Sequence, residues 1–433
     1  MAAQPHARVG AAAGGVKPVA SDAAVSRPGI PAYAWVVFAL TFGLLISDYM
    51  ARQVLNAVFP LLKAEWALTD GQLGFLAGVV PLMVGLLTCP ISLLADRIGR
   101  VRSIVVMAAL WSLATLLCGL AKNYDQMLAA RVLVGVGEAA YGSVGIAVII
   151  GVFPKHLRAT LAGAFMAGGL AGQVLGVGIG GAVAAAHGWR TAFHAIGIAG
   201  IVLALAFAWF VTESRVRAQE ECERKSVTLG SLKALFAGRA LNCAYVASGL
   251  QLFVAGALPA WLPTYFVRYY ALPLQQATSL AAIFLAIGGA GMVLCGMASD
   301  KLVRTTSQRA MLSTIYCLGC ALLIAAAFAL GPGTPQLILL GLAMFLAAAT
   351  AGPAGAMVAH LTPAALHGTA FAVLTLANNA FGLAPGPIVT GWLADRIGLA
   401  GALQWLPLAS LAAALVFFAA ARGREPQLAA QAA

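Results

Sequence analysis

Long apolar runs, separated by short segments that hold nearly all of the charge, constrain this 433-residue chain more than any other feature. Charged residues make up 9% of the sequence, whereas soluble domains carry about 25%, and the mean hydropathy is +0.92. A run of about 20 apolar residues crosses the roughly 30 Å hydrocarbon core as a helix. The short alternating segments of a membrane β-barrel are not visible. The sequence therefore predicts an all-α membrane protein.

Twelve apolar runs can be placed, six on each side of a charged segment. They lie near residues 33–59, 71–94, 102–121, 127–152, 160–185, 190–211, 240–266, 275–299, 309–330, 335–358, 365–390 and 399–420. We predict 12 transmembrane helices in two pseudo-symmetric six-helix bundles. The predicted parts are a disordered cytoplasmic tail (1–30), an N-terminal bundle (31–211), a cytoplasmic linker (212–239), a C-terminal bundle (240–421) and a second cytoplasmic tail (422–433).

Basic residues are distributed unevenly between alternate loops. If both termini are cytoplasmic, the cytoplasmic segments hold 19 of the 26 Lys and Arg, and the outer segments hold five. The positive-inside rule therefore predicts that both termini are cytoplasmic. We expect a multi-pass protein of the bacterial inner (plasma) membrane. The net charge of +12 does not indicate a nucleic-acid partner, because the basic residues lie in short loops and form no patch.

The two halves repeat a short loop pattern. Ser92–Arg100 follows the second span, and Gly296–Arg304 follows the eighth. Each begins with a small residue, reaches an Asp four positions later, continues with a basic residue, and has an Arg four positions after the Asp. A six-plus-six repeat is typical of secondary transporters, whose substrate site lies between the halves near the middle of the membrane.

Four charged residues fall within the predicted spans: Asp48, Arg52, Arg131 and Glu138. An ionised side chain at the bilayer centre costs at least ~2.5–3.5 kcal/mol, so each needs a partner, a cavity or a function. Asp48 and Arg52 are four residues apart, and Arg131 and Glu138 are seven apart, so each pair shares one face of its helix. Counting residues along each span places both carboxylates near the middle of the membrane.

Two interpretations of this group remain open. The first is a structural ion-pair network that holds spans 1 and 4 together. The second, which we favour, is that Asp48 and Glu138 take up and release a proton during a transport cycle, because burial and a nearby arginine act on a carboxylic acid in opposite directions. In that case Arg52 and Arg131 hold an anionic substrate through bidentate hydrogen bonds.

Several motifs carry a family resemblance. Arg131–Tyr141 resembles the fourth-helix motif of Spinster-like members of the major facilitator superfamily, and Ser92–Arg100 resembles the superfamily's loop signature. The resemblance covers about residues 33–420 and implies the major facilitator fold, with functional roles for Arg131 and Glu138. Spinster-like proteins usually carry an adjacent Asp-Arg in helix 1, whereas this chain has Ala51-Arg52 with its acid at Asp48. The organic-anion:proton symporters of the superfamily are therefore an equal alternative.

The resemblance also implies a role for the two loop motifs in conformational gating. The residues concerned are Asp96, Arg97, Arg100, Asp300 and Arg304. An aspartate there can cap a helix N-terminus in one conformation and not in the other, which biases the equilibrium between them. The alternative is that the arginines are topology anchors.

The second half offers polar and aromatic groups in place of charges. Candidates to line a substrate cavity are Gln251, Trp261, Tyr265, Asn378 and Asn379, although the two aromatic residues are equally consistent with an interfacial belt. A ladder of glycines in span 5, Gly168 to Gly181, predicts close packing, with rocking against a helix of the other half. Asp395 is interpreted as the terminator of span 11.

These observations predict a secondary active transporter that works by alternating access, most plainly as a proton-coupled symporter of a small organic anion. Export of a lysolipid, drug or other amphiphile is the alternative. A membrane enzyme or a channel is disfavoured, because HExxH, GxSxG and P-loop motifs are missing and no ring of charges is evident. The histidines and cysteines lack ligand spacing, so no metal and no cofactor are expected. We expect a monomer in the lipid bilayer.

Overall fold

The computed structural model describes residues 32–213, 235–236, 238–363 and 366–422, and these segments are helical. The predicted tails and most of the linker lie outside the described residues. The first half contains α1 (Ala32–Trp66), α2 (Asp70–Ile98), α3 (Arg100–Leu120), α4 (Tyr124–Glu138), α5 (Tyr141–Val152), α6 (Lys155–His187) and α7 (Trp189–Phe210). The second half contains α10 (Arg239–Tyr269), α11 (Leu274–Leu302), α12 (Thr306–Ala329), α13 (Thr334–Ala347), α14 (Ala351–Leu361), α15 (His367–Asn378), the π-helix η2 (Asn379–Leu383), α16 (Pro385–Gln404) and α17 (Leu406–Ala421).

These elements confirm the prediction of twelve spans, several of which are interrupted. Span 4 consists of α4 and α5, span 10 of α13 and α14, and span 11 of α15, η2 and the first part of α16. Eleven helical segments of the described chain are long and apolar enough to cross a membrane. The twelfth span starts inside α16, where Gly398 has φ +77° and turns the chain back. Only glycine adopts such a φ without strain, so Gly398 ends span 11.

Helix ends follow local chemistry. Thr69 caps α2 and Thr305 caps α12, and in both the glutamine three residues later completes a reciprocal capping box. The connections α2–α3 and α6–α7 turn at Gly99 (φ +110°) and Gly188 (φ +85°). These signals keep the connections short, so successive spans run antiparallel.

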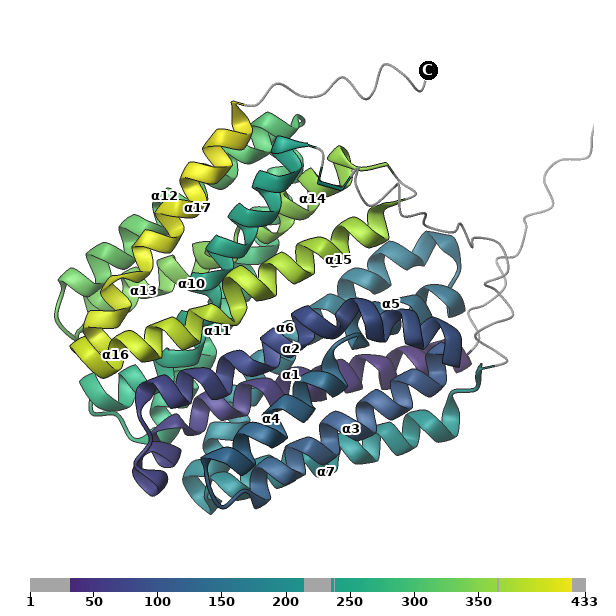
Figure 1. Ribbon diagram of the computed structural model, residues 1–433, viewed down its shortest axis with the longest axis horizontal. Coiled ribbons are helices and arrows are strands. Elements are labelled where there is room, and N and C mark those ends of the chain that lie inside the picture. Colours follow the sequence, from purple (N-terminus) through teal and green to yellow (C-terminus); the bar gives the residue numbers. More distant parts are fainter. Residues whose placement is uncertain (1–31, 214–234, 237, 364–365, 423–433) are drawn as a thin grey trace, which may run out of the picture.

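The spans form two bundles that meet along α2 with α16 and along α6 with α11 (Figure 1). The two bundles converge at the end that carries the α1–α2 connection, residues 67–69, which we call the gate end. They diverge towards the opposite end, where α7 ends and α10 begins, which we call the linker end. The contact across the bundles is tight, because a Cβ placed on Gly74 of α2 would lie 2.3 Å from the Pro387 carbonyl oxygen.

The glycine ladder of α6 packs mainly within its own bundle. A Cβ on Gly172 would lie 2.6 Å from the Ile46 carbonyl oxygen, and one on Gly176 would lie 2.8 Å from Met50 Cα, so the ladder holds α6 against α1. The expected packing against the other half falls to other positions of α6, which also contacts α11 of the second bundle. Gly178 and Gly181 approach α11 of the other bundle, at Ala282 and Thr278.

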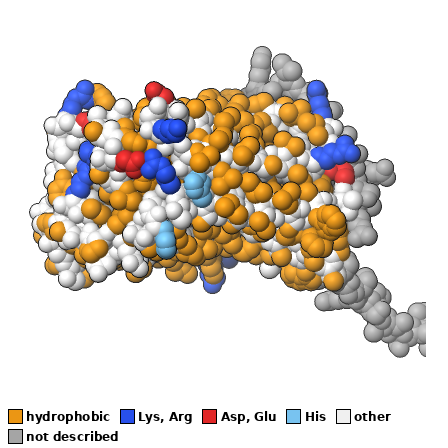
Figure 2. Space-filling view, turned by 90° about the horizontal axis from the view of Figure 1, so that it is seen from below, with side chains coloured by type: hydrophobic (Ala, Val, Ile, Leu, Met, Phe, Trp, Pro, Cys, Tyr) orange, Lys and Arg blue, Asp and Glu red, His pale blue; other side chains and the backbone are white. Residues whose placement is uncertain are grey.

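The outer surface matches a membrane environment. Hydrophobic side chains cover most of the middle of the face in Figure 2, and the charged side chains gather mainly towards the two ends. The surface includes large exposed apolar side chains such as Leu205, Leu322 and Leu415. In water such a band would be an aggregation surface, but lipid chains cover it in a bilayer.

Candidate functional site

Three of the four predicted charges form one buried group. Arg52 extends from α1 between two carboxylates: its Nε lies 2.6 Å from Oε2 of Glu138 on α4, and its Nη2 lies 3.8 Å from Oδ2 of Asp48 one turn earlier. Asp48 and Glu138 are each 2% exposed. The spacing of four residues on α1 and the antiparallel position of α4 bring these side chains to one place, as the sequence predicted.

The contact between Arg52 and Glu138 is an ion pair without the alignment of a hydrogen bond. Arg52 Nε, both carboxylate oxygens of Glu138 and Oδ1 of Asp48 have no hydrogen-bond partner among the described residues. Glu138 is also the last residue of α4, at the interruption between α4 and α5. A buried carboxylate in this position requires a cation or a proton.

Arg131, the fourth charge, has a different environment. Its guanidinium donates to three backbone carbonyl oxygens, those of Ala51 (2.9 Å), Arg52 (3.3 Å) and Leu76 (3.4 Å), and the residue is 1% exposed. Arg131 therefore joins α4 to α1 and α2 through the backbone. The side chain of Arg52 is 16% exposed, which makes it the more accessible of the two cations.

Neighbouring polar residues on the same part of α1 were missed by the sequence analysis. Arg52 lies over the ring of Tyr49, with 5.0 Å from Cζ to the ring centre. One turn further on, Gln53 accepts a hydrogen bond from Asn56 (2.6 Å) and contacts Gln173 of α6 (3.4 Å). The available signal was the spacing of Tyr49, Gln53 and Asn56, which are four and three residues apart and so share one face of α1. It was overlooked because uncharged polar residues stand out less than charges in an apolar span.

The candidates on α10 are buried in the second bundle. Gln251 donates to the carbonyl oxygen of Ala347 (3.1 Å), and Tyr265 donates to Oε1 of Gln336 (3.1 Å). Trp261 donates to the Pro387 carbonyl oxygen (3.1 Å), and its ring packs on Phe59 of the first bundle, 5.2 Å between centres. Trp261 thus lies at the contact of the two bundles near the gate end.

The two asparagines lie where span 11 is irregular. Ser248 of α10 donates to Oδ1 of Asn378 (2.8 Å). Asn379 starts η2 and donates to the Thr375 carbonyl oxygen (2.9 Å), and its own Oδ1 has no hydrogen-bond partner in the part of the chain that the structure describes. A Cβ on Gly85 of α2 would lie 2.9 Å from Asn379 Cβ, so this residue also faces the first bundle. A π-helical turn inside an α-helix often marks a functional position.

The first loop motif lies at the linker end. Arg100 Nε lies 3.7 Å from Oδ1 of Asp96, and both side chains are partly or largely exposed, as is Arg97. The sequence analysis missed Glu213, which follows α7 and accepts from the backbone N–H groups of Arg100 (3.1 Å) and Val101 (3.0 Å). Glu213 therefore caps the N-terminus of α3 and ties the motif to the end of the first bundle.

The second loop motif is joined by an ion pair to the helix that follows it. Asp300 is paired with Arg309 of α12, 3.6 Å from Oδ1 to Nη1. Arg304 is exposed, and its backbone N–H donates to Gln308 (3.1 Å) as part of the start of α12. Both motifs thus place an acid at the end of the second helix of a bundle.

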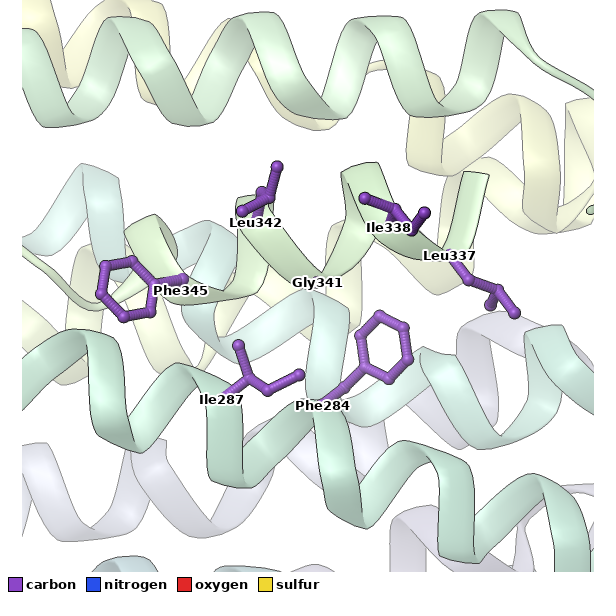
Figure 3. Close-up of a pocket in the computed structure, with 7 residues that line it drawn as sticks. All are labelled: Phe284, Ile287, Leu337, Ile338, Gly341, Leu342 and Phe345. Atoms are coloured by element: carbon purple, nitrogen blue, oxygen red, sulfur yellow. The ribbon is translucent and has the colours of Figure 1, made fainter. Parts of the chain in front are cut away.

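Two surface hollows do not include any of the predicted residues. One, of about 360 Å³, lies between α11 and α13 and has an entirely apolar lining that includes Phe284, Ile338 and Phe345 (Figure 3). The other, of about 460 Å³, lies at the gate end of the first bundle beside Lys122 and Asp125. Among the described residues, groups of three or more potential metal ligands are lacking.

Several proteins similar to this chain are named as transporters. The chain is 27% identical over 347 residues to the probable L-galactonate transporter of Escherichia coli (strain K12), which covers 76% of both chains. It is 29% identical over 224 residues to the protein spinster of Drosophila melanogaster, which covers 50% of this chain and 36% of that one. Both levels of identity indicate distant relatives.

The fold matches solved structures over nearly its whole length. A bacterial homolog of the human lysosomal transporter Spinster, in an inward-facing and occupied conformation, superposes with a TM-score of 0.81 at 20% identity, covering 91% of this chain and 98% of that one. A D-xylose-proton symporter gives 0.73 at 18% identity, covering 91% and 100%. The sequence profile of the Major Facilitator Superfamily matches residues 41–379. The chain is therefore a member of the Major Facilitator Superfamily, a multi-pass membrane transporter and not an enzyme.

Proposed function

We propose that this protein is a proton-coupled symporter of a small organic anion that works by alternating access. Arg52 binds the acidic group of the substrate, and Asp48 and Glu138 carry the proton. The observation that carries the proposal is the 2.6 Å contact between Arg52 and Glu138, in which Arg52 Nε and both carboxylate oxygens of Glu138 lack a hydrogen-bond partner among the described residues.

Competition for one guanidinium couples the two cargoes. Glu138 forms an ion pair with Arg52 when no substrate is present. A substrate carboxylate can therefore pair with Arg52 only if the Glu138 side chain moves away. An ionised Glu138 without Arg52 would be an unpaired buried charge, which costs several kcal/mol, so the acid takes up a proton as it leaves. Release of the substrate returns Arg52 to Glu138 and expels the proton.

Arg131 supports this exchange by fixing the helix that carries Arg52. Its hydrogen bonds to the carbonyl oxygens of Ala51 and Arg52 hold α1 at the level of the site. We assign it a positioning role together with the weaker of the two substrate contacts. Asn378 and Asn379 would hydrogen-bond the uncharged end of the substrate, and Gln251, Trp261 and Tyr265 would form the wall behind them.

The curated relatives support an organic anion. Besides the L-galactonate transporter, they include a gallate transporter of Pseudomonas putida (24% identical over 325 residues) and a hexuronate transporter of Bacillus subtilis (23% over 370 residues). Each name describes a small carboxylate-bearing compound. A carboxylate is also the group that a partly exposed arginine binds with two parallel hydrogen bonds.

The test is uptake into proteoliposomes after a pH jump, with a panel of sugar acids, aromatic acids, neutral sugars and lysolipids. We expect uptake of an acid that is driven by an inward proton gradient and abolished by a protonophore. Uptake at the same rate with and without the proton gradient would refute symport.

Replacing Glu138 by Gln should reduce proton-driven accumulation at least tenfold while leaving part of the exchange of preloaded substrate. A glutamine does not carry the proton, yet it vacates Arg52 for the substrate. The matched control is Glu65→Gln, because Glu65 pairs with Arg190 (2.8 Å) within the first bundle, at the gate end and away from the site. If Glu138→Gln accumulated substrate as well as Glu65→Gln, Glu138 would be a structural residue.

A second candidate is the export of an amphiphile. Likeness to the protein spinster and to a sphingosine-1-phosphate transporter of Danio rerio, 26% identical over 311 residues, favours it. The phosphate of such a lipid would take the place of the carboxylate on Arg52. Transport of lysolipids and not of sugar acids in the panel would establish this alternative.

We also propose an orientation in the membrane and a gating role for the two loop motifs. The linker end is cytoplasmic because the adjacent loops carry most of the basic residues, and the protein works as a monomer in the bacterial inner membrane. Asp96, Arg97 and Arg100, and their counterparts Asp300 and Arg304, would form contacts between the bundles when the linker end closes.

A further inference from the structure

Asp395, near the end of span 11, caps a helix of the other bundle. Its Oδ1 accepts from the backbone N–H of Asp70 (2.7 Å), and its Oδ2 accepts from that of Gly71 (2.8 Å). These two N–H groups belong to the first turn of α2, where no carbonyl of the helix itself can accept them. The interpretation of Asp395 as a helix terminator was wrong, because Gly398 ends the helix and the Asp395 side chain instead binds the start of α2.

The capped residue makes a second contact between the bundles. The carboxylate of Asp70 accepts two hydrogen bonds from Arg268 of α10, each 2.6 Å, in a bidentate arrangement. Lys63 of α1 also contacts Asp70 Oδ1 at 2.6 Å. Asp70 is 3% exposed. Charge-assisted hydrogen bonds at a buried position are stronger than surface ion pairs, so this contact contributes to stability more than its position near a membrane surface suggests.

The sequence around Asp395 is repeated at the opposite end of the partner helix. The hexapeptide Leu-Ala-Asp-Arg-Ile-Gly occurs at 94–99, where α2 ends, and at 393–398, where span 11 ends. Both copies finish with a glycine at positive φ. Because α2 and α16 pack against each other and run in opposite directions, the two copies lie at opposite ends of one helix pair. In this structure the copy at 393–398 contacts the first bundle through Asp395.

We propose that Asp395, Asp70 and Arg268 form a latch that holds the gate end closed. Each of its hydrogen bonds joins the two bundles, because Asp70 and Gly71 belong to the first bundle and Asp395 and Arg268 to the second. Opening the gate end breaks four hydrogen bonds at once and exposes the first turn of α2. The latch therefore stabilises the conformation described here and no other, and it sets the fraction of molecules that are open at the gate end.

The test measures the two ends of the molecule separately with pairs of spin labels in lipid nanodiscs. One pair, Lys122→Cys and Gly331→Cys, reports the gate end, and another, Gly163→Cys and Gly368→Cys, reports the linker end. All four positions are exposed, and they lie on opposite bundles within each pair. Cys89, Cys222 and Cys243 are replaced by Ser beforehand, whereas Cys118, Cys295, Cys317 and Cys320 are buried and can remain.

The variants are Asp395→Asn and Arg268→Gln, and the control is again Glu65→Gln. Loss of a charged helix cap predicts an increase of about tenfold in the ratio of long to short distances at the gate end. The linker-end distance should shorten in the same molecules, because the bundles move as rigid bodies. If the ratio of long to short gate-end distances in both variants stayed within twofold of the control, the proposed latch would be refuted.

A misfolded variant is distinguishable from an opened one. Misfolding broadens both distance distributions, whereas opening exchanges one defined distance for another at each end. Arg268→Gln leaves the cap by Asp395 intact, so it tests the same latch if Asp395→Asn does not fold. The measurement needs no substrate. Its failure would leave the proposed symport untouched, and failure of symport would leave the latch standing.

Discussion

Gly74 on α2 offers a direct way to separate the two bundles at the gate end. In the substitution Gly74→Ala, the new Cβ would lie 2.3 Å from the Pro387 carbonyl oxygen, 3.0 Å from its carbonyl carbon and 3.2 Å from Ile388 Cα. The first distance is more than about 1 Å shorter than an ordinary carbon contact. All three atoms belong to backbone, so they cannot move aside as a flexible side chain would.

The size of the effect follows from this overlap. Overpacking of a tight contact typically costs about 1–3 kcal/mol, and here the whole cost falls on the conformation in which the bundles touch. Alanine also favours a helix over glycine by about 1 kcal/mol, but this gain is the same whether the gate end is open or closed and cancels. We therefore expect the open fraction to rise about 5- to 150-fold, since 1.4 kcal/mol corresponds to tenfold.

The assay is the gate-end distance between labels at positions 122 and 331. Gly163→Ala is the matched control, because a Cβ there would meet nothing within 4 Å. Its distance distribution should equal that of the parent protein. If Gly74→Ala also left the distribution unchanged, the close approach of α2 to Pro387 would not determine the closed state, and the reasoning would be refuted.

Two other substitutions test contacts that the spacing of residues did not reveal. Arg131→Lys keeps the charge but loses most of the hydrogen bonds to three carbonyl oxygens, so it should destabilise the protein by about 2–4 kcal/mol. Thermal unfolding in detergent, compared with that of the exposed Arg102→Lys, checks this, and equal melting temperatures would contradict it. Glu213→Gln removes the charged cap of α3, at a cost of about 0.5–2 kcal/mol. Hydrogen exchange of a peptide covering 97–105 should quicken up to about 30-fold; unchanged exchange would show that the cap contributes nothing.

The central charges were predictable because two strong local signals coincide. Asp48 and Arg52 are the charged residues of span 1, and Arg131 and Glu138 those of span 4, and helical spacing places each pair on one face. Their division of roles was not predictable. Arg131 and Arg52 are equivalent in the sequence, and only the position of α4 against α1 directs one guanidinium to backbone carbonyls and the other to Glu138.

The contacts between the bundles were the least predictable part. Lys63 and Arg268 are two of the five basic residues that had been assigned to the outer segments, and Asp395 had been assigned to a helix end, because each lies near the end of an apolar run. Their roles depend on Asp70, which lies 198 residues from Arg268 and 325 from Asp395 in the sequence. Helical periodicity relates residues a few turns apart and carries no information about pairs at such separations.

The sequence by itself determined the twelve spans, the two-bundle arrangement and the identity of the buried charges. These follow from hydrophobicity, loop charge and helical spacing, which are local and act on each segment before it meets another. The tertiary structure alone decided which arginine faces Glu138, which helix the glycine ladder supports, and where the bundles join. The reason is that lipid satisfies every apolar helix face about equally, so the choice of partners depends on close packing and on a few buried polar contacts.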